Sequence, residues 1–450
     1  MNLFAKSALL PTGWARDVSL RVDAGRIVEV TPGASPSGTV HGCLLPAPVN
    51  LHSHMFQRAM AGMTEVRTAG QDSFWTWRAL MYRFLERLTP KDVQAIAAQA
   101  MLEMAEAGFA AVAEFHYLHH PAGGGTYADP AEMSARVAAA AAESGLGLTH
   151  LPVIYEQGGV DGRALAGGQL RFGSPPEVYW QVVEGAARAM AGMPDATLGV
   201  APHSLRAVSR DTLARVAGLL PGGPVHIHIA EQLAEVAEVQ AAWGARPVDW
   251  ACANLPLDRR WCMIHATQMT PDETAALART GAVAGLCPTT EANLGDGIFD
   301  GPGWLASGGV FGVGTDSNVR ISLTEELRLL EYSQRLNLKA RAVMADNTRS
   351  TGRLLWDGVA AGGSQAAGRA SGAIAPGMWA DLLALDTGDV RLEGVSGDGL
   401  LDALVFAGRD GLVTDLWSAG RHIVRQGRHI ARDSVEPRFR ATLQRLREAL

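Results

Sequence analysis

Two histidines separated by one residue, His52 and His54, end a short apolar run that begins near Val49. In an extended chain, residues i and i+2 point to the same side, so both imidazoles can face one point. Neutral imidazole nitrogens bind Zn²⁺ at about 2 Å. An isolated pair of this kind is more often a chance pair of surface histidines, so its meaning depends on the rest of the chain.

Other side chains that can bind a metal also follow short apolar runs. His228 and Glu231 follow one run, His265 ends another, and Asp316 comes after a third. Three imidazoles and a carboxylate suit Zn²⁺ or a similar divalent ion that keeps a position open for water. Such an ion lowers the pKa of its water and supplies a nucleophile near neutral pH. The sequence therefore predicts a hydrolytic metal site.

The residues leave two assignments open. His226 shares an apolar run with His228 and competes with it as a ligand, but we favour His228 because Glu231 lies just beyond it. Glu231 is either a ligand or a proton shuttle. We favour the shuttle, because a hydrolysis that expels an amine must move a proton from water to the leaving nitrogen.

The middle of the chain alternates helix and strand signals. Thr89 and Pro90 are typical of a helix start, and Gly108 is typical of its end. Further helices are expected to begin near Asp129, Ser174, Ser209, Pro247 and Thr270. Strands are expected at the apolar runs 44–51, 110–115, 148–154, 198–201, 225–229, 262–264, 282–286 and 310–314. This pattern predicts a closed (β/α)8 TIM barrel, whose active sites lie at the C-terminal ends of the strands.

Both ends of the chain have strand signals instead. Residues 17–22 and 26–30 predict a β-hairpin. Further strands are expected at 380–385, 401–406, 412–417 and 421–425, and a helix is expected after Glu436. Neither end can cover its own apolar face, so we expect one small β-sandwich built from both termini. The expected division is residues 1–46 and 376–450 for the sandwich and 47–375 for the barrel.

Composition narrows the class of protein. The 450 residues are 47% hydrophobic and 19% charged, with a formal net charge of −7. The sequence has no block of basic residues, so nothing in it indicates nucleic acid or an anionic membrane as a partner. The four scattered cysteines form no pair typical of disulfide or thiolate-metal sites. The first residues are unlike a secretory signal, so we expect a cytoplasmic protein.

The order of the metal-binding residues resembles the amidohydrolase superfamily, in which a barrel carries a flanking β-sandwich. Members with two metals have a lysine ending the fourth strand, whereas residues 201–204 contain none, which favours one ion. Segment 228–231 resembles the deaminase branch. That resemblance implies that Glu231 shuttles protons, that His265 polarises the substrate, and that Asp316 binds metal and takes a proton. The implied metal ligands are His52, His54, His228 and Asp316.

Segments 50–62 and 72–83 resemble the formimidoylglutamate deiminase family. This resemblance implies hydrolysis of N-formimino-L-glutamate to N-formyl-L-glutamate and ammonia, in histidine degradation. The implied substrate contacts are Gln57, Arg78, Tyr117, His203 and Arg206. A substrate with two carboxylates needs fixed cations, and Arg206 and Arg78, which is expected in the loop after the first strand, supply them. We also expect a homo-oligomer, a dimer.

Two other functions fit the same residues. A purine or other aminoheterocycle deaminase would use the same single metal ion and stack Trp75 and Trp77 on a ring. A metal-binding scaffold without catalysis needs neither Glu231 nor His265, which makes it the weaker alternative. The sequence assigns no role to Glu291.

Overall fold

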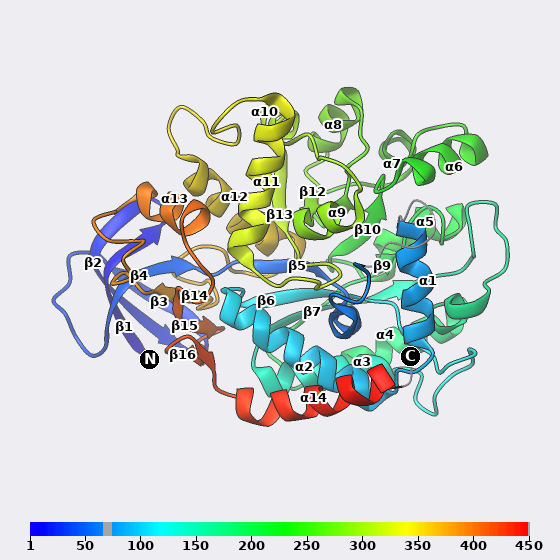
Figure 1. The fold of residues 1–450 in the computed structure, drawn as a ribbon, viewed down its shortest axis with the longest axis horizontal. Helices are drawn as coiled ribbons and strands as arrows, with labels where there is room; N and C mark the ends of the chain where they lie inside the picture. Colours follow the sequence, from blue (N-terminus) through cyan, green and yellow to red (C-terminus); the bar gives the residue numbers. More distant parts are fainter. Residues whose placement is uncertain (66–73, 449–450) are drawn as a thin grey trace.

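The computed structural model describes residues 1–65 and 74–448, and the side chains of residues 74–76 are outside this description. Asp72 and Ser73, and the side chain of Trp75, therefore lie outside the described residues. Parallel strands occupy the middle of the molecule, and a mixed sheet formed by both chain ends lies beside them (Figure 1).

The central strands form a ring in chain order. They are β5 (Val49–Ser53), β6 (Ala111–His116), β7 (Gly147–Ile154), β8 (Thr197–Leu198), β9 (Ala201–Pro202), β10 (Val225–Ile229), β11 (Trp261–His265), β12 (Val283–Leu286) and β13 (Val310–Val313). β7 pairs with both β8 and β9, which share one strand position. Parallel bridges from Val200 to Val225 and from Ser53 to Asp316 join the two halves. Each predicted run is a strand, although 44–51 is divided between β4 (Val40–Pro46) and β5.

Helices lie outside the ring, in the alternation that the sequence predicts. They are α1 (Phe74–Leu85), α2 (Pro90–Ala107), α3 (Glu132–Ser144), α4 (Pro176–Met190), α5 (Arg210–Leu219), α6 (Leu233–Trp243), α7 (Pro247–Asn254), α8 (Pro271–Ala278), α9 (Pro288–Leu294), α10 (Gly301–Ala306), α11 (Leu323–Leu338) and α12 (Thr351–Ala366). Side-chain caps explain the predicted helix starts at Thr89, Ser209 and Thr270. Thr89 and Asp92 form a capping box at α2, and Gly108 ends this helix at φ 105°, where glycine avoids strain.

Strands from both chain ends pair in one eight-stranded sheet with the order β17-β16-β15-β14-β4-β1-β2-β3. Besides β4, these are β1 (Asn2–Leu10), β2 (Gly13–Asp23), β3 (Arg26–Thr31), β14 (Leu382–Leu385), β15 (Val413–Ser418), β16 (Arg421–Arg425) and β17 (Arg428–His429). The predicted hairpin is confirmed, because β2 and β3 pair antiparallel. The chain ends thus complete each other within one sheet, and a two-layered sandwich stays a prediction.

The strand predicted at 401–406 is wrong, because these residues belong to helix α13 (Asp398–Phe406). Leu400, Leu401, Leu404 and Val405 are buried. Their spacing places them on one face of a helix, and a short apolar run does not distinguish this pattern from a strand. The C-terminal helix also begins earlier than predicted, since α14 spans Arg432–Glu448. This helix packs along α2 (Figure 1).

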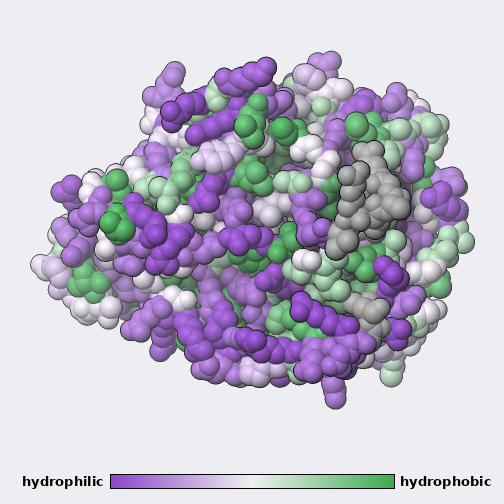
Figure 2. All heavy atoms as spheres, viewed as in Figure 1, coloured by the Kyte–Doolittle hydropathy of each residue, from purple (hydrophilic) through white to green (hydrophobic). Residues whose placement is uncertain are grey.

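The surface in Figure 2 is mostly polar, with apolar side chains in small groups. No helix within residues 1–65 and 74–448 combines the length and apolar character needed to cross a membrane.

A buried ion-pair network ties the barrel to the terminal sheet. The Arg369 guanidinium donates to Asp381 Oδ2 at 2.6 Å and to Asp195 Oδ2 at 3.0 Å. Arg421 of β16 donates to the same Asp195 carboxylate, with Nη2 at 2.7 Å from Oδ2. Arg369 is buried with both carboxylates. Because each charge has a partner, the network offsets the large cost of removing these groups from water.

We expect Arg369→Met to lower the free energy of unfolding by about 3–5 kcal/mol, because it leaves buried carboxylates without their cation. Urea unfolding followed by circular dichroism measures the change. Arg21→Met is the matched control, since the Arg21–Glu29 pair is 57% exposed on both sides and should matter by less than about 1 kcal/mol. Equal midpoints for the two variants would contradict the importance of the network.

Candidate active site

The predicted metal-binding residues converge at the C-terminal ends of the barrel strands. His52 is near the end of β5, with His54 just beyond it, His228 is in β10, His265 ends β11, and Asp316 follows β13. All five are buried. The backbone has positive φ at His265 (69°) and Asp316 (44°). Such strained conformations are typical of functional sites.

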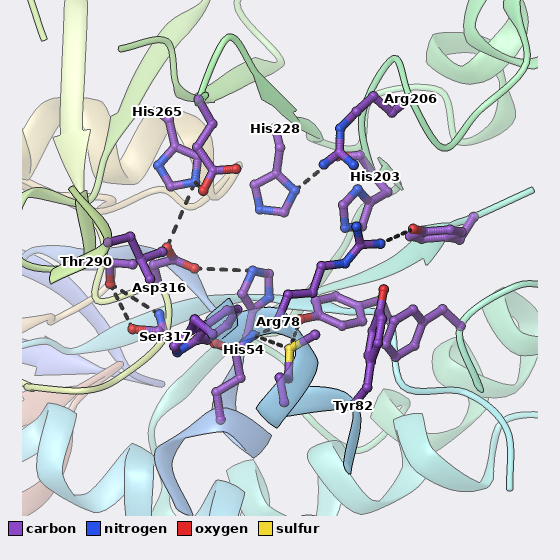
Figure 3. A pocket seen from close by; sticks show the side chains of 18 residues that line it. His54, Arg78, Tyr82, His203, Arg206, His228, His265, Thr290, Asp316 and Ser317 are labelled. Atoms are coloured by element: carbon purple, nitrogen blue, oxygen red, sulfur yellow. Dashed lines mark hydrogen bonds and ion pairs between the residues drawn. The ribbon is translucent and has the colours of Figure 1, made fainter. Parts of the chain in front are cut away.

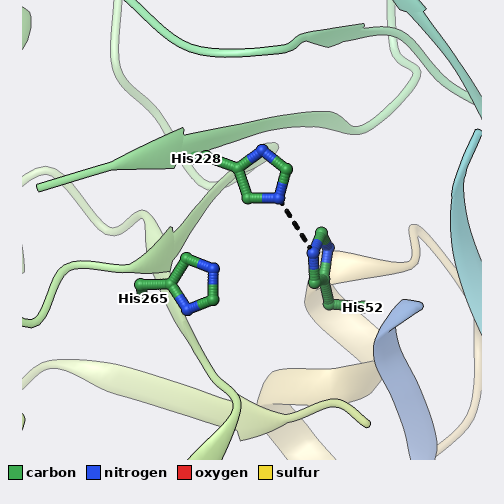
Figure 4. A group of neighbouring side chains, drawn as sticks. All are labelled: His52, His228 and His265. Atoms are coloured by element: carbon green, nitrogen blue, oxygen red, sulfur yellow. Dashed lines mark hydrogen bonds between the residues drawn. The ribbon is translucent and has the colours of Figure 1, made fainter. Parts of the chain in front are cut away.

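Two groups of three side chains, which share His52, are close enough to hold an ion: His52, His54 and Asp316 form one, and His52, His228 and His265 form the other. Asp316 Oδ1 lies 3.5 Å from His52 Nε2 and 3.2 Å from His54 Nε2. His52 Nε2 lies 3.1 Å from His228 Nε2 (Figure 4). Tetrahedral ligands about 2.0–2.1 Å from Zn²⁺ are about 3.3 Å apart, which matches these separations.

Backbone contacts leave the ring nitrogens of two histidines available as ligands. His54 Nδ1 lies 2.8 Å from the carbonyl oxygen of Phe115, and His228 Nδ1 lies 3.0 Å from that of His203. When Nδ1 donates to a carbonyl, the proton is on that nitrogen and the lone pair is on Nε2. Burial lowers the pKa of His54 and of His228, so both rings are neutral, as ligation requires.

His226 does not join this group. Its Nε2 lies 2.7 Å from the carbonyl oxygen of Ala366. The groups of described residues that are close enough to share a metal ion include His52, His54, His228, His265, Cys287 and Asp316, but not His226. The geometry therefore favours His228 over His226 as the ligand from β10.

His265 lies among three carboxylates. Its Nε2 is 3.8 Å from Glu231 Oε1 and 3.9 Å from Asp316 Oδ2, and its Nδ1 is 3.3 Å from Glu291 Oε1. Burial alone lowers the pKa of His265, but these carboxylates outweigh it and raise the pKa to about 10. His265 is thus an imidazolium held between Glu291 and the two other acids. This contact is the structural role of Glu291 that the sequence did not indicate.

Glu231 and Asp316 have opposite protonation behaviour although both are buried. Burial raises the pKa of Glu231 to about 7, and the nearby charges of Asp316 and Glu235 add to the effect. Burial also favours protonated Asp316, but the hydrogen bond with His52 and the adjacent imidazoles hold its pKa well below the usual range. Two carboxyl groups with separated pKa values can divide the roles of proton carrier and fixed anion.

A pocket of about 570 Å³, including its open mouth, lies over this cluster. The residues predicted to contact substrate all line it: Gln57, Arg78, Tyr117, His203 and Arg206. In Figure 3, Arg206 and His203 lie on one side of the pocket, and Asp316, Thr290 and Ser317 lie on the opposite side. The pocket thus has a cationic wall facing an acid–base cluster.

Local elements hold these pocket residues in place. Arg78 is in helix α1 rather than in the predicted loop, and its Nη2 donates to Tyr155 Oη at 3.4 Å. Gln57, in the short 3₁₀ helix η1 (Met55–Met60), donates to Tyr117 Oη at 2.7 Å. Trp77 lines the pocket. This position suits either stacking on a substrate ring or packing against neighbouring side chains.

Sequence comparison assigns the chain to a family. Residues 43–423 match the amidohydrolase family, and residues 2–39 match the N-terminal domain of the formimidoylglutamate deiminase HutF. The chain belongs to the amidohydrolase family.

Individual relatives agree with this assignment. The chain is 48% identical over 456 residues to the formimidoylglutamate deiminase of Pseudomonas aeruginosa, covering 100% of this chain and 99% of the relative. The crystal structure of an amidohydrolase from Brucella melitensis superposes with a TM-score of 0.95, at 46% identity and with 99% of both chains covered. A zinc-bound adenosine deaminase from Xanthomonas campestris superposes with a TM-score of 0.84 at 21% identity, covering 99% of this chain and 98% of its own. This last likeness supports the fold alone.

The donor set fits the metal ion that this amidohydrolase fold uses. Three neutral imidazoles and one ionised carboxylate are nitrogen and oxygen ligands of the kind that Zn²⁺ prefers. The three lysines are not at the C-terminal ends of the barrel strands: Lys6 is in β1, Lys91 is in α2, and Lys339 caps α11. The lysine that bridges two ions in binuclear members therefore has no counterpart at the strand ends.

We expect the purified protein to carry about one divalent ion per chain. His228→Ala and Asp316→Ala should each lose this ion, because they remove a ligand from a four-ligand set. Elemental analysis of dialysed protein measures the content. His226→Gln is the matched control from the same strand and should keep the ion. Two tightly bound ions per wild-type chain would contradict the prediction.

Proposed function

We propose that the protein hydrolyses N-formimino-L-glutamate to N-formyl-L-glutamate and ammonia, as a step of histidine degradation. The 48% identity over the whole chain to a relative named formimidoylglutamate deiminase supports this activity. The match of residues 2–39 to the HutF N-terminal domain supports it independently of the barrel. The geometry of the pocket gives the physical reason for the substrate.

One observation carries the proposal: Arg78 and Arg206 line the same pocket as Glu231 and three of the predicted metal ligands, His54, His228 and Asp316. The substrate has one carboxylate on the carbon that bears the formimino nitrogen and a second carboxylate at the end of its side chain. Guanidinium groups bind carboxylates with paired, charge-assisted hydrogen bonds. With its carboxylates on the arginines, the substrate extends its formimino carbon toward Asp316 and His265.

His203 lines the pocket together with Arg78 and Arg206, but its side chain is neutral. Burial lowers its pKa well below the usual value, and the charges of Arg206 and Arg78 lower it further. It therefore adds a hydrogen-bonding ring without adding a third charge. Gln57 and Tyr117 are hydrogen-bonded to each other and offer polar atoms to the rest of the substrate.

The reaction adds water to the formimino carbon and breaks the bond from this carbon to the terminal nitrogen, which leaves as ammonia. His52, His54, His228 and Asp316 would hold the divalent ion, which when bound would supply an activated water. Glu231 takes a proton from the water and gives it to the leaving nitrogen. A pKa of about 7 suits a group that must both accept and donate near neutral pH.

His265 and Asp316 act on either side of the reacting carbon. Protonated His265 polarises the substrate by donating from Nε2, while Glu291 holds Nδ1. Asp316, which would also hold the ion, accepts the second proton of the added water as the intermediate collapses, and this proton leaves with the departing nitrogen as ammonia. Because its pKa is held low, Asp316 stays ionised for this role.

The remaining features of the proposal follow from the same assignment. The resident ion is a single Zn²⁺, and the active form is a homodimer located in the cytoplasm. Residues 1–46 and 376–450 form a β-sandwich domain beside the 47–375 barrel. Metal analysis, analytical ultracentrifugation and cell fractionation test the first three of these features.

Glu231→Gln should lower kcat by at least about 10²-fold, the usual cost of losing an acid–base group, while keeping the metal ion and the fold. Stopped-time ammonia assays and elemental analysis measure both effects. The informative comparison is with His228→Ala, which should lose the ion. Loss of the ion from both variants would make Glu231 a ligand instead of a proton carrier.

Arg206→Met should lower kcat/KM for N-formimino-L-glutamate by roughly thirty- to several-thousand-fold with the ion still bound, because it removes one partner of a buried charge pair. Arg206→Lys should restore only part of the activity, since a point charge replaces a two-pronged donor. Arg210→Met is the control, because Arg210 stacks on Trp243 outside the pocket.

A substrate panel separates the proposal from the aminoheterocycle alternative. We expect ammonia release to be fastest with N-formimino-L-glutamate among formimino amino acids, guanine and adenosine. An aminopurine has no carboxylate to place on the arginine wall. Faster turnover of guanine, or unchanged kcat/KM in both Arg206 variants, would make the substrate assignment wrong.

A further inference from the structure

Glu235, on the first turn of helix α6, faces back toward the end of β10 and has no role in the reaction as described above. It is buried, at 3% exposure. Its Oε2 accepts a hydrogen bond from the backbone nitrogen of Glu231 at 3.0 Å, and its Oε1 accepts one from that of Ala230 at 3.3 Å. One carboxylate therefore binds two consecutive amides of the segment that carries the proton shuttle.

This segment is a sharp turn that needs external support. Ala230 has φ of 50°, in the left-handed region that costs an L-residue about 1–2 kcal/mol. The turn lets the chain leave β10, with His228 inside the barrel, and place Glu231 Oε1 3.8 Å from His265 Nε2. Removing the Glu235 carboxylate would take away the hydrogen-bond acceptor of both the Ala230 and the Glu231 amide.

Charge reinforces the contact. Burial raises the pKa of Glu235, whereas Arg206 and the two backbone amides favour its ionised form. In turn, Glu235 is the first of the groups whose charge raises the pKa of Arg206 against its burial. Glu235 thus contacts the segment that moves the proton, and its charge also acts on the arginine proposed to hold the substrate.

We propose that Glu235 is a positioning residue that fixes the Ala230–Glu231 turn and thereby holds the Glu231 carboxylate in its proton-transfer geometry. This inference rests on the proposed function, in which Glu231 is the shuttle. It concerns the supporting contact and leaves the identity of the substrate unchanged.

A double-mutant cycle tests the inference in the metal-loaded enzyme with N-formimino-L-glutamate. Glu235→Gln keeps the size of the side chain but loses one acceptor oxygen and turns an amide NH₂ toward a backbone N–H. In the wild-type background we expect kcat to fall about tenfold with KM within about twofold. In the Glu231→Gln background the same change should cost less than about twofold, because the shuttle is already absent.

Control measurements separate positioning from general damage. Glu238→Gln removes a like charge from the same helix, and its charge also acts on Arg206. This control should keep kcat within about twofold of wild type. A tenfold loss in Glu238→Gln, or equal losses from Glu235→Gln in both backgrounds, would overturn the positioning role.

Hydrogen exchange provides a readout that needs no substrate. The amides of Ala230 and Glu231 should exchange at least about tenfold faster in Glu235→Gln than in wild type, with no comparable change in helix α5. Unchanged exchange at both amides would overturn the proposal even if activity fell. If the wild type does not act on N-formimino-L-glutamate while exchange does change, the proposed function fails and the contact stands.

Discussion

The arrangement of the site depends on two backbone hydrogen bonds between segments that are far apart in the sequence, around His52 and Asp316. The Asp316 nitrogen donates to the His52 carbonyl at 2.9 Å, and the His54 nitrogen donates to the Asp316 carbonyl at 2.8 Å. These bonds join the segment after β13 to β5, so that the strand ring is continuous there. The same bonds bring the Asp316 carboxylate against both imidazoles, because the side chains of paired strand ends are adjacent. The contacts that close the strand ring therefore also bring the Asp316 carboxylate next to His52 and His54.

Electrostatic balance explains why so many ionisable groups can be buried together. His265 carries a positive charge among three carboxylates, and Arg206 is stabilised by Glu235 and Glu231. Each buried charge faces opposite charges, which offsets much of its desolvation cost. The imidazoles of the histidines predicted to bind metal stay neutral because burial opposes their protonation. The site thus keeps neutral donors for a metal beside charged groups for proton transfer.

The sequence predicted the strands well, and it predicted which residues lie at the C-terminal ends of these strands, because both depend on local patterns. Buried parallel strands are short apolar runs, and each run is followed by the residues at its C-terminal end, such as His228 and Asp316. The pattern failed where apolar runs are ambiguous, as at 401–406, which is helix α13. The helix that carries Arg78 was also missed, although the residue itself lines the pocket as predicted.

The sequence could not predict contacts that depend on how the backbone turns after a strand ends. Glu235 follows Glu231 by four residues, but its contact exists only because Ala230 has a left-handed conformation and α6 begins directly afterwards. The same limit applies to Glu291, whose contact with His265 joins helix α9 to strand β11. Spacing indicates which residues share a strand end, whereas these contacts depend on the direction in which each chain segment leaves the sheet.

The strand order of the terminal sheet has a consequence for synthesis of the chain. β4 lies between β1 and β14, so one edge of β4 is paired only after residues 382–385 have been made. At roughly 5–20 residues per second, a ribosome takes tens of seconds to make the intervening segment. During this time the nascent chain presents an open strand edge, the feature most prone to pairing with other chains. The barrel strands β5 to β13 are all translated within that interval, so the sheet is completed only after the barrel has been made.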